Sequence, residues 1–234
     1  MIREQGLGVL TGEIGSGKST LLRQARRALD PLRYTDVYVS LPGLRPKDFY
    51  GELLSHLGET PPYTLASARR LWLERCDTLL ADGAKQWVLW VDEAQEMTDV
   101  MLEELRFVHR RQTDARPLFT LILSGQPELR RRLRMRRHEA TLQRVTAAYH
   151  LTGMTKEETA AYIRAQMERT ERRVLFADSA VTVVHRASQG LPRVVNQICR
   201  QALFATASTE REVIEEGDIQ RVLADRDKQR GAAG

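Results

Sequence analysis

The stretch that most constrains this chain is Gly12–Ser19, which reads GEIGSGKS. It fits the pattern G-x-x-x-x-G-K-[ST] at every fixed position. The short apolar run Leu7–Leu10 precedes it, and apolar residues follow at helical spacing from Thr20 to Leu29. A strand, a glycine-rich turn and a helix in this order allow consecutive backbone N–H groups to surround a phosphate chain. The alternative is a chance glycine-rich turn, which would leave the lysine, the serine and both flanks unexplained.

This loop predicts a site for ATP and Mg²⁺. Lys18 supplies a positive charge for the β- and γ-phosphates, and the Ser19 hydroxyl is a ligand type that Mg²⁺ accepts. The backbone and side chains expected to bind the nucleotide are Gly12, Glu13, Ile14, Gly15, Ser16, Gly17, Lys18, Ser19 and Thr20.

Length, charge and cysteine content narrow the class of protein. A chain of 234 residues suits one large domain, or a core with a smaller second domain. With 36 basic and 31 acidic residues, a polyanionic partner is permitted only through a local basic surface. The sequence has no apolar run of membrane-spanning length and no signal-peptide pattern. Cys76 and Cys199 lack metal-ligand spacing. We therefore expect a cytoplasmic protein without a membrane span or structural metal.

The first two thirds of the chain alternate between strand and helix patterns. The predicted strands after the phosphate loop are 36–41, 86–91, 118–123 and 147–151, and the predicted helices are 47–57, 65–80 and 100–111. The run 86–91 is apolar almost throughout, as in a parallel strand that is buried on both faces. This order predicts an α/β fold with a parallel sheet, helices on its faces and right-handed crossovers.

From Met154 onward the pattern is helical only. The features that define these helices are the capping box Thr155–Glu158, a cap at Asp178, the turn Gly190–Arg193, and a start near Glu216 with an end before Asp225. The predicted organisation is an α/β core over 1–153, an all-helical lid over 154–228 and a disordered tail over 229–234.

Polar residues follow two of the predicted strands. Asp92 and Glu93 come directly after the strand 86–91, where open α/β sheets bind ligands. There Asp92 can hold Mg²⁺ through its water shell, and Glu93 can orient the attacking water. Ser124 follows the next strand and can reach the γ-phosphate or that water. The alternatives are a solvated acidic turn and, for Ser124, a cap for the helix at Pro127.

Together these motifs resemble the AAA+ ATPases over nearly the whole chain. The segments VDEAQ at 91–95, LSGQPEL at 123–129, LQRV at 142–145 and QGLPRVVN at 189–196 are similar to those of the ExeA-type secretion ATPase. They are also similar to those of the transposition helper ATPases, such as the phage Mu B-like and TniB-like proteins.

The resemblance implies roles for single residues. Ser124 would be the sensor-1 residue, Arg144 an arginine finger that reaches a neighbouring subunit's nucleotide, and Arg193 the sensor-2 arginine. The alternatives are a surface salt bridge for Arg144 and a solvated helix start for Arg193. The complete site would form only in an ATP-dependent homo-oligomer, either a ring or a filament. Family members carry a segment before the phosphate loop that walls the adenine. Residues 1–6 are short for it, so we expect an incomplete adenine pocket or a start codon further upstream.

Basic clusters suggest a second ligand. Residues 130–137 contain six arginines, a composition typical of phosphate binding. The candidate nucleic-acid contacts are Arg45, Lys47, Arg110, Arg111, Arg130, Arg131 and Arg132. The alternative for the run is a solvated helix exterior.

The sequence thus predicts an ATP-hydrolysing protein. We expect a transposition helper that oligomerises on double-stranded DNA and recruits or activates a transposase. The alternatives are an ExeA-type secretion-assembly ATPase and a small-molecule kinase. The Asp92–Glu93 tandem argues against the kinase, because phosphoryl transfer to a small molecule needs no water-activating glutamate.

Overall fold

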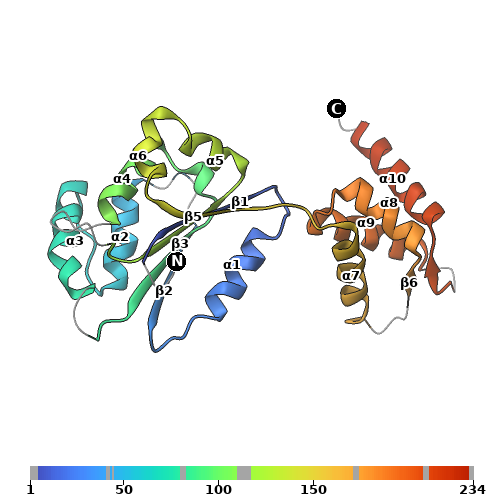
Figure 1. The fold of residues 1–234 in the computed structure, drawn as a ribbon, viewed down its shortest axis with the longest axis horizontal. Coiled ribbons are helices and arrows are strands. Elements are labelled where there is room, and N and C mark those ends of the chain that lie inside the picture. The colour runs from blue at the N-terminus through green and yellow to red at the C-terminus, as the bar shows by residue number, and fades with distance from the viewer. Residues whose placement is uncertain are drawn as a thin grey trace. The chain divides into compact units, whose positions relative to one another are not determined.

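The computed structural model of the protein describes residues 5–40, 43, 45–79, 83–109, 117–170, 174–207 and 211–231. The chain forms two compact units. The first comprises Met1–Gly12 with Lys18–Leu151, and the second comprises Glu13–Gly17 with Thr152–Gly234. The first unit is an α/β sheet structure, and the second consists mainly of helices (Figure 1).

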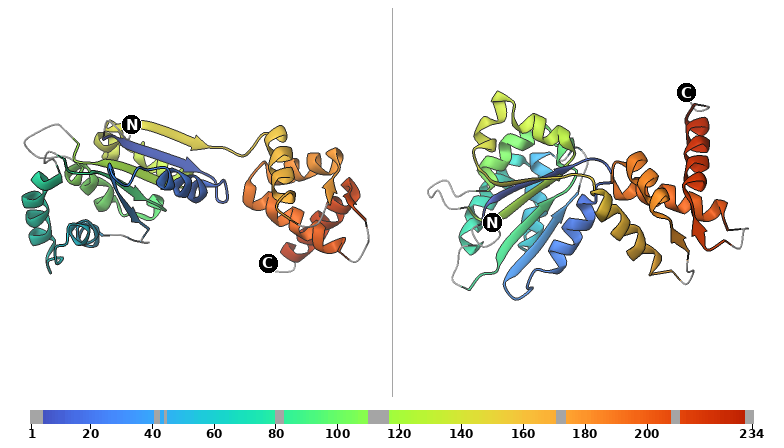
Figure 2. Two further views of the ribbon diagram at one scale, coloured as in Figure 1. Left: turned by 90° about the horizontal axis from the view of Figure 1, so that it is seen from below. Right: turned by 45° about the vertical axis from the view of Figure 1, so that its right-hand side comes forward.

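The centre of the first unit is a five-stranded sheet in which every neighbouring pair is parallel. Its strands are β1 (Leu7–Gly12), β2 (Tyr34–Val39), β3 (Gln86–Val91), β4 (Thr120–Gly125) and β5 (Val145–Leu151). Their spatial order is β2-β3-β4-β1-β5, and the strands fan out with the usual twist (Figure 2). This arrangement confirms the predicted fold class. It also brings the carboxyl ends of β1, β3 and β4 to one edge.

Helices cover the sheet in the first unit. They are α1 (Lys18–Arg27), α2 (Pro46–His56), α3 (Leu65–Leu79), α4 (Asp99–Val108), α5 (Pro127–Leu133) and α6 (Glu139–Leu142), with the 3₁₀-helices η2 (Ala94–Glu96) and η3 (Arg136–His138). One core packs the sheet against α2 to α5 and contains Phe49, Trp72 and Leu102. A smaller core on the α1 side contains Leu22 and Trp90. Since both faces are covered, β1 and β4 are buried along their whole length.

The second unit contains α7 (Lys156–Met167), β6 (Leu175–Phe176), α8 (Asp178–Ser188), α9 (Pro192–Ala205), β7 (Val213–Ile214) and α10 (Glu216–Gly231). Its helices share a core of their own that includes Ile163, Val184, Ile198 and Ile219. The predicted capping box is present, because Thr155 Oγ1 accepts from the backbone N–H of Glu158 and the Glu158 carboxylate accepts from that of Thr155.

Three predictions for this unit were wrong. The unit is not purely helical, because β6 and β7 pair in parallel; two-residue strands are too short to leave a periodic signal. Ala177, not Asp178, is the N-cap of α8, and Asp178 is its first residue. The last helix does not end before Asp225 but continues to Gly231, with an ion pair of 3.7 Å between Asp225 and Lys228. Residues 229–231 of the predicted disordered tail are therefore helical, while 232–234 lie outside the described residues.

The predicted helix 100–111 ends earlier, at Val108, and residues 110–116 lie outside the described part. None of the helices in the described ranges has the length and apolar character needed to cross a membrane.

Candidate nucleotide-binding site

The phosphate-loop motif connects β1 to α1. Gly17 has φ +102°, a backbone conformation that residues with side chains rarely adopt, and it turns the chain into the first turn of α1. Lys18 begins this helix, and its side chain is buried. Its ammonium group donates a hydrogen bond of 2.7 Å to the carbonyl oxygen of Gly12. The charge is therefore held at the base of the loop, beside the N–H groups that open α1.

The loop contains a buried hydroxyl group that a phosphate oxygen could bind. Among the described residues, Ser16 Oγ is buried and has no hydrogen-bond partner. Burying a hydroxyl without a partner is costly, and a phosphate oxygen would accept its proton. The loop thus suits a polyphosphate.

Hydrogen-bond donors from several parts of the first unit converge on the Asp92 carboxylate. Asp92 follows β3, is 6% exposed, and accepts four hydrogen bonds. Its Oδ1 atom accepts from Ser124 Oγ at 2.9 Å and from the backbone N–H of Glu93 at 3.0 Å. Its Oδ2 atom accepts from Tyr38 OH at 3.0 Å and from Ser19 Oγ at 3.2 Å. Hydroxyl and carboxylate oxygens are the donor set that Mg²⁺ prefers, so the Ser19–Asp92 pair suits that ion.

Ser124 makes a contact that the sequence analysis did not predict, and its sensor role remains a prediction. It lies within β4 and is fully buried, and its hydroxyl donates to Asp92. Gln126 is the N-cap residue of α5, so the alternative reading of Ser124 as a helix cap is wrong.

Tyr38 was missed by the sequence analysis. It lies in β2 opposite Trp90 of β3. Because side chains alternate along strands, Tyr38 shares a face with Asp92, two residues after Trp90. Burial and then the negative charge of Asp92 raise the pKa of Tyr38, which keeps its hydroxyl protonated as a donor. Arg26 lies over its ring, 4.4 Å from the centroid. Tyr38 neighbours the site because β2 lies beside β3 in the sheet, and this strand order cannot be read from the sequence.

Glu93 begins the turn after β3. Its φ is +52°, in the left-handed region, and its side chain is exposed. Gln95 Nε2 donates a hydrogen bond of 2.6 Å to Glu93 Oε2, and Gln95 Oε1 accepts one of 2.9 Å from the backbone N–H of Gln126. A Cβ at Gly125 would lie 2.7 Å from Gln95 Oε1, so glycine leaves the space that the amide fills. Gln95 thereby ties the Glu93 carboxylate to the end of β4.

The two arginines given roles by the resemblance have different surroundings. Arg144 is half-buried ahead of β5, and its guanidinium donates to the carbonyl oxygen of Ala140. Arg193 is the exposed second residue of α9, and its backbone N–H donates a hydrogen bond of 3.2 Å to the carbonyl oxygen of Gly15 in the phosphate loop. Their roles remain predictions.

Several of the predicted nucleic-acid contacts have partners within the protein. Arg45 pairs with Asp48 at 3.1 Å, the Lys47 ammonium lies 4.8 Å from the ring centroid of Tyr63, and Arg131 pairs with Glu128. Arg132 binds two backbone carbonyls and Asp99. Arg130 is exposed on α5. Arg110 and Arg111 lie outside the described residues.

Comparison with known proteins agrees with this geometry. The family model described as "AAA domain" matches residues 2–133. The chain belongs to this AAA domain family. It is also 34% identical over 218 residues to General secretion pathway protein A of Aeromonas hydrophila. The match covers 92% of this chain but 39% of that protein. The AAA+ resemblance is thus confirmed, and the similarity supports the ExeA-type group.

Solved structures share the fold at low sequence identity. The ORC2 protein of Aeropyrum pernix in its ADP form is 14% identical with a TM-score of 0.64, covering 94% of this chain and 62% of that one. The RuvB Holliday junction branch migration motor of Thermotoga maritima is 19% identical with a TM-score of 0.62, covering 94% and 61%. Drosophila ORC bound to DNA is 20% identical with a TM-score of 0.63, covering 96% and 57%.

Proposed function

We propose that this protein binds ATP with Mg²⁺ and hydrolyses it to ADP and phosphate. The observation that carries the proposal is the 3.2 Å hydrogen bond between Ser19 Oγ and Asp92 Oδ2, which joins residues 73 positions apart. The bond joins the hydroxyl of the phosphate loop to the carboxylate that follows β3, and the buried Lys18 directly precedes Ser19 in the chain. Membership of the AAA domain family supports the same conclusion.

The side chains of the site divide the work of nucleotide binding. The ammonium of Lys18 would exchange its bond to Gly12 for the terminal phosphates, and Ser16 would donate its unpaired hydroxyl to a phosphate oxygen. Ser19 and, through water, Asp92 would hold Mg²⁺. When bound, that ion would neutralise charge that develops between the β- and γ-phosphates. Ser124 and Tyr38 hold the two oxygens of Asp92 in place.

Glu93 is the group we assign to the attacking water. Gln95 occupies its Oε2 atom, which leaves Oε1 to accept a hydrogen bond from water. A carboxylate in that position orients the water and draws its proton as the bond to phosphorus forms. Arg144 of a neighbouring subunit and Arg193 would add positive charge to the transition state in an oligomer.

The experiment that tests this proposal compares three proteins. Wild type should bind ATP and release phosphate only with Mg²⁺ present. Lys18→Ala should lose nucleotide binding, because the loop loses its charge on the terminal phosphates. Glu93→Gln should bind ATP with near-wild-type affinity and turn it over far more slowly, by roughly the hundredfold to ten-thousandfold expected of general-base loss. Equal turnover in wild type and Glu93→Gln would remove Glu93 from this role.

For the biological role we propose an ATPase module of the ExeA type that acts in secretion. The similarity to General secretion pathway protein A, which extends over 92% of this chain, favours it. The second candidate is the DNA-binding transposition helper with a transposase partner. The exposed Arg130 and Arg131 favour that role, although Arg132 is bound within the protein. Affinity of the ATP-bound protein for duplex DNA separates the two.

A further inference from the structure

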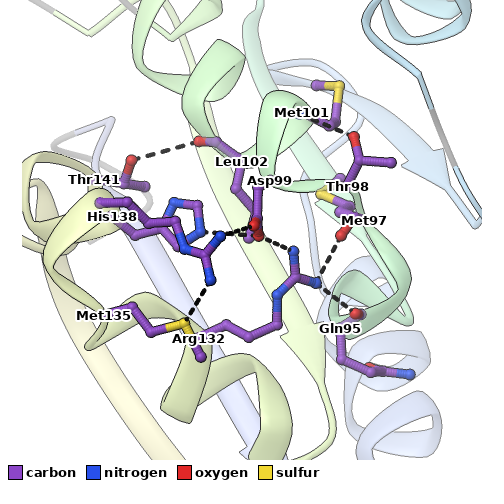
Figure 3. Close-up of polar contacts among 11 residues, drawn as sticks. Gln95, Met97, Thr98, Asp99, Met101, Leu102, Arg132, Met135, His138 and Thr141 are labelled. Atoms are coloured by element: carbon purple, nitrogen blue, oxygen red, sulfur yellow. Dashed lines mark hydrogen bonds and ion pairs between the residues drawn. The ribbon is translucent and has the colours of Figure 1, made fainter.

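One arginine of the basic run points into the protein. Arg132 projects from α5 toward the turn that follows Glu93 (Figure 3). Its Nη1 atom donates to the carbonyl oxygens of Gln95 at 2.7 Å and of Met97 at 2.6 Å. Its Nη2 atom donates to Asp99 Oδ1 at 2.6 Å. Only 20% of the side chain is exposed, so water competes weakly for these bonds.

Asp99 anchors this guanidinium. It is the first residue of α4, where the helix N-terminus favours a negative charge. Besides Arg132, its carboxylate binds Arg137 Nη1 at 2.6 Å through Oδ2, and His138 Nε2 lies 3.0 Å from Oδ1. The imidazole of His138 is fully buried and points toward Asp99 (Figure 3). Three side chains from α5 and η3 thus fix Asp99, and Asp99 in turn fixes the orientation of Arg132.

The two carbonyls that Arg132 holds belong to the segment that positions Glu93. Gln95 lies within η2, the 3₁₀-helix that begins directly after Glu93, and Met97 follows that helix. The Gln95 side chain contacts the Glu93 carboxylate, while its backbone carbonyl is bound by Arg132. A planar guanidinium fork can bind two carbonyls and a carboxylate at once, which a lysine cannot do.

We propose that Arg132, anchored by Asp99, is a positioning residue for Glu93. It joins the turn that carries Glu93 and Gln95 to α5, the helix that directly follows β4 and Ser124. The Glu93 carboxylate and the Ser124 hydroxyl are thereby kept in a fixed geometry. The inference rests on the proposed hydrolysis and deepens it. It also gives Arg132 a role other than the nucleic-acid contact predicted from the sequence.

The rival explanation is a purely structural bond that holds α4 against α5. Such a bond would stabilise the fold, yet its loss would not change the turnover of molecules that remain folded. A positioning role predicts a fall in kcat with unchanged ATP affinity. It also predicts that replacing Arg132 lowers kcat only when Glu93 is present. A purely structural bond would not depend on Glu93 in this way.

The test uses the full chain with four variants: Arg132→Gln, Arg132→Lys, Glu93→Gln and the double variant Arg132→Gln with Glu93→Gln. The matched control is Arg134→Gln, because Arg134 is exposed at the end of the same helix and makes no salt bridge within the described residues. Circular dichroism sets a temperature at which every variant is folded. Rates are measured at protein concentrations where they no longer rise, by single turnover for the slow variants.

We expect Arg132→Gln to lower kcat by roughly tenfold to a hundredfold, the cost of a displacement of about 1 Å in a catalytic group. Its ATP affinity should stay within about twofold of wild type, because Lys18 and Ser19 are untouched. Arg132→Lys should be intermediate, and Arg134→Gln should match wild type. The double variant should have the same kcat as Glu93→Gln, since the carboxylate that Arg132 would position is already absent.

Two different failures are distinguishable. If wild type hydrolyses ATP and folded Arg132→Gln has the same kcat, or if the losses from Arg132→Gln and Glu93→Gln multiply, Arg132 is structural and the positioning role is overturned. If wild type binds ATP but releases no phosphate above the uncatalysed background, the proposed hydrolysis itself fails, and the positioning role fails with it. Should Arg132→Gln not fold, Arg132→Lys decides the question by the same comparison of kcat and affinity.

Discussion

The Tyr38 hydroxyl donates a hydrogen bond of 3.0 Å to Asp92 Oδ2, the same oxygen that accepts from Ser19. The bond crosses from β2 to the end of β3, so a strand without any residue of the phosphate loop contributes to the metal-binding carboxylate. A metal ion that recruits Ser19 would leave Tyr38 as the remaining hydroxyl on Oδ2. Tyr38 would then hold Oδ2 while Ser124 and the Glu93 N–H hold Oδ1.

We expect Tyr38→Phe to weaken the binding of Mg²⁺ at Asp92 without unfolding the protein. Loss of one hydrogen bond to a charged group costs about 1.5–3 kcal/mol, which corresponds to roughly a tenfold to hundredfold higher Mg²⁺ concentration at half-maximal activity. A Mg²⁺ titration of ATP turnover measures this shift. Tyr149→Phe is the matched control, because Tyr149 is 64% exposed. An unchanged titration curve in Tyr38→Phe would show that Ser124 and Glu93 suffice to orient Asp92.

We expect turnover to depend on assembly, because Arg144 is assigned to a neighbour's nucleotide. Specific activity should rise with protein concentration, and Arg144→Ala should lower turnover while it leaves ATP affinity nearly unchanged. Mixing Arg144→Ala with Lys18→Ala should restore part of the activity, since each variant supplies the half-site that the other lacks. A rate independent of concentration, together with no rescue in the mixture, would make Arg144 an ordinary structural residue.

The anchor of Arg132 has a predictable dependence on pH. Hydrogen bonds from Arg132 and His138, with the charge of Arg137, lower the pKa of Asp99 from 3.8 to about 2. A carboxyl group with a lowered pKa contributes stability above its ordinary value, and that contribution is lost as the pH falls toward the folded-state value. The difference in thermal unfolding between wild type and Asp99→Asn should thus be constant above about pH 5. It should shrink between pH 3.8 and about 2. A difference that stays constant down to pH 2 would contradict the assigned pairing.

Binding to DNA distinguishes the two biological roles. A transposition helper should bind duplex DNA more tightly with ATP, because assembly aligns a weak patch from each subunit along one duplex. Each neutralised phosphate should contribute roughly −0.9 to the slope of log affinity against log salt. Replacing the exposed Arg130 should flatten the slope if the run is the contact, and replacing Arg45 and Lys47 together should do so if their segment is. Absence of duplex affinity at low salt would leave the secretion role.

The sequence predicted the parts of the site that lie on one continuous motif. Glycine-rich spacing located Lys18 and Ser19, and an apolar strand pattern located Asp92 and Glu93. It did not predict Tyr38, because its place beside Asp92 depends on which strands are neighbours. The sequence indicated a surface role for Arg132, because helical periodicity assigns a side chain to a helix face only. It does not reveal that the carbonyls of Gln95 and Met97 lie beside that face. Short strands such as β6 were missed for another reason, since two residues are too few to show the alternating pattern of a strand.

The close approach of the Gln95 amide to Gly125 has a practical consequence. A methyl group there would lie 2.7 Å from Gln95 Oε1 and 3.2 Å from the Gln95 backbone nitrogen. The flexible amide must move away, and Glu93 loses its tether while Lys18, Ser19, Asp92 and Glu93 all keep their own side chains. Gly125→Ala therefore offers a way to arrest the protein with its triphosphate still bound. Such a stalled form could be used as bait to capture whatever the ATP-bound state engages in the cell.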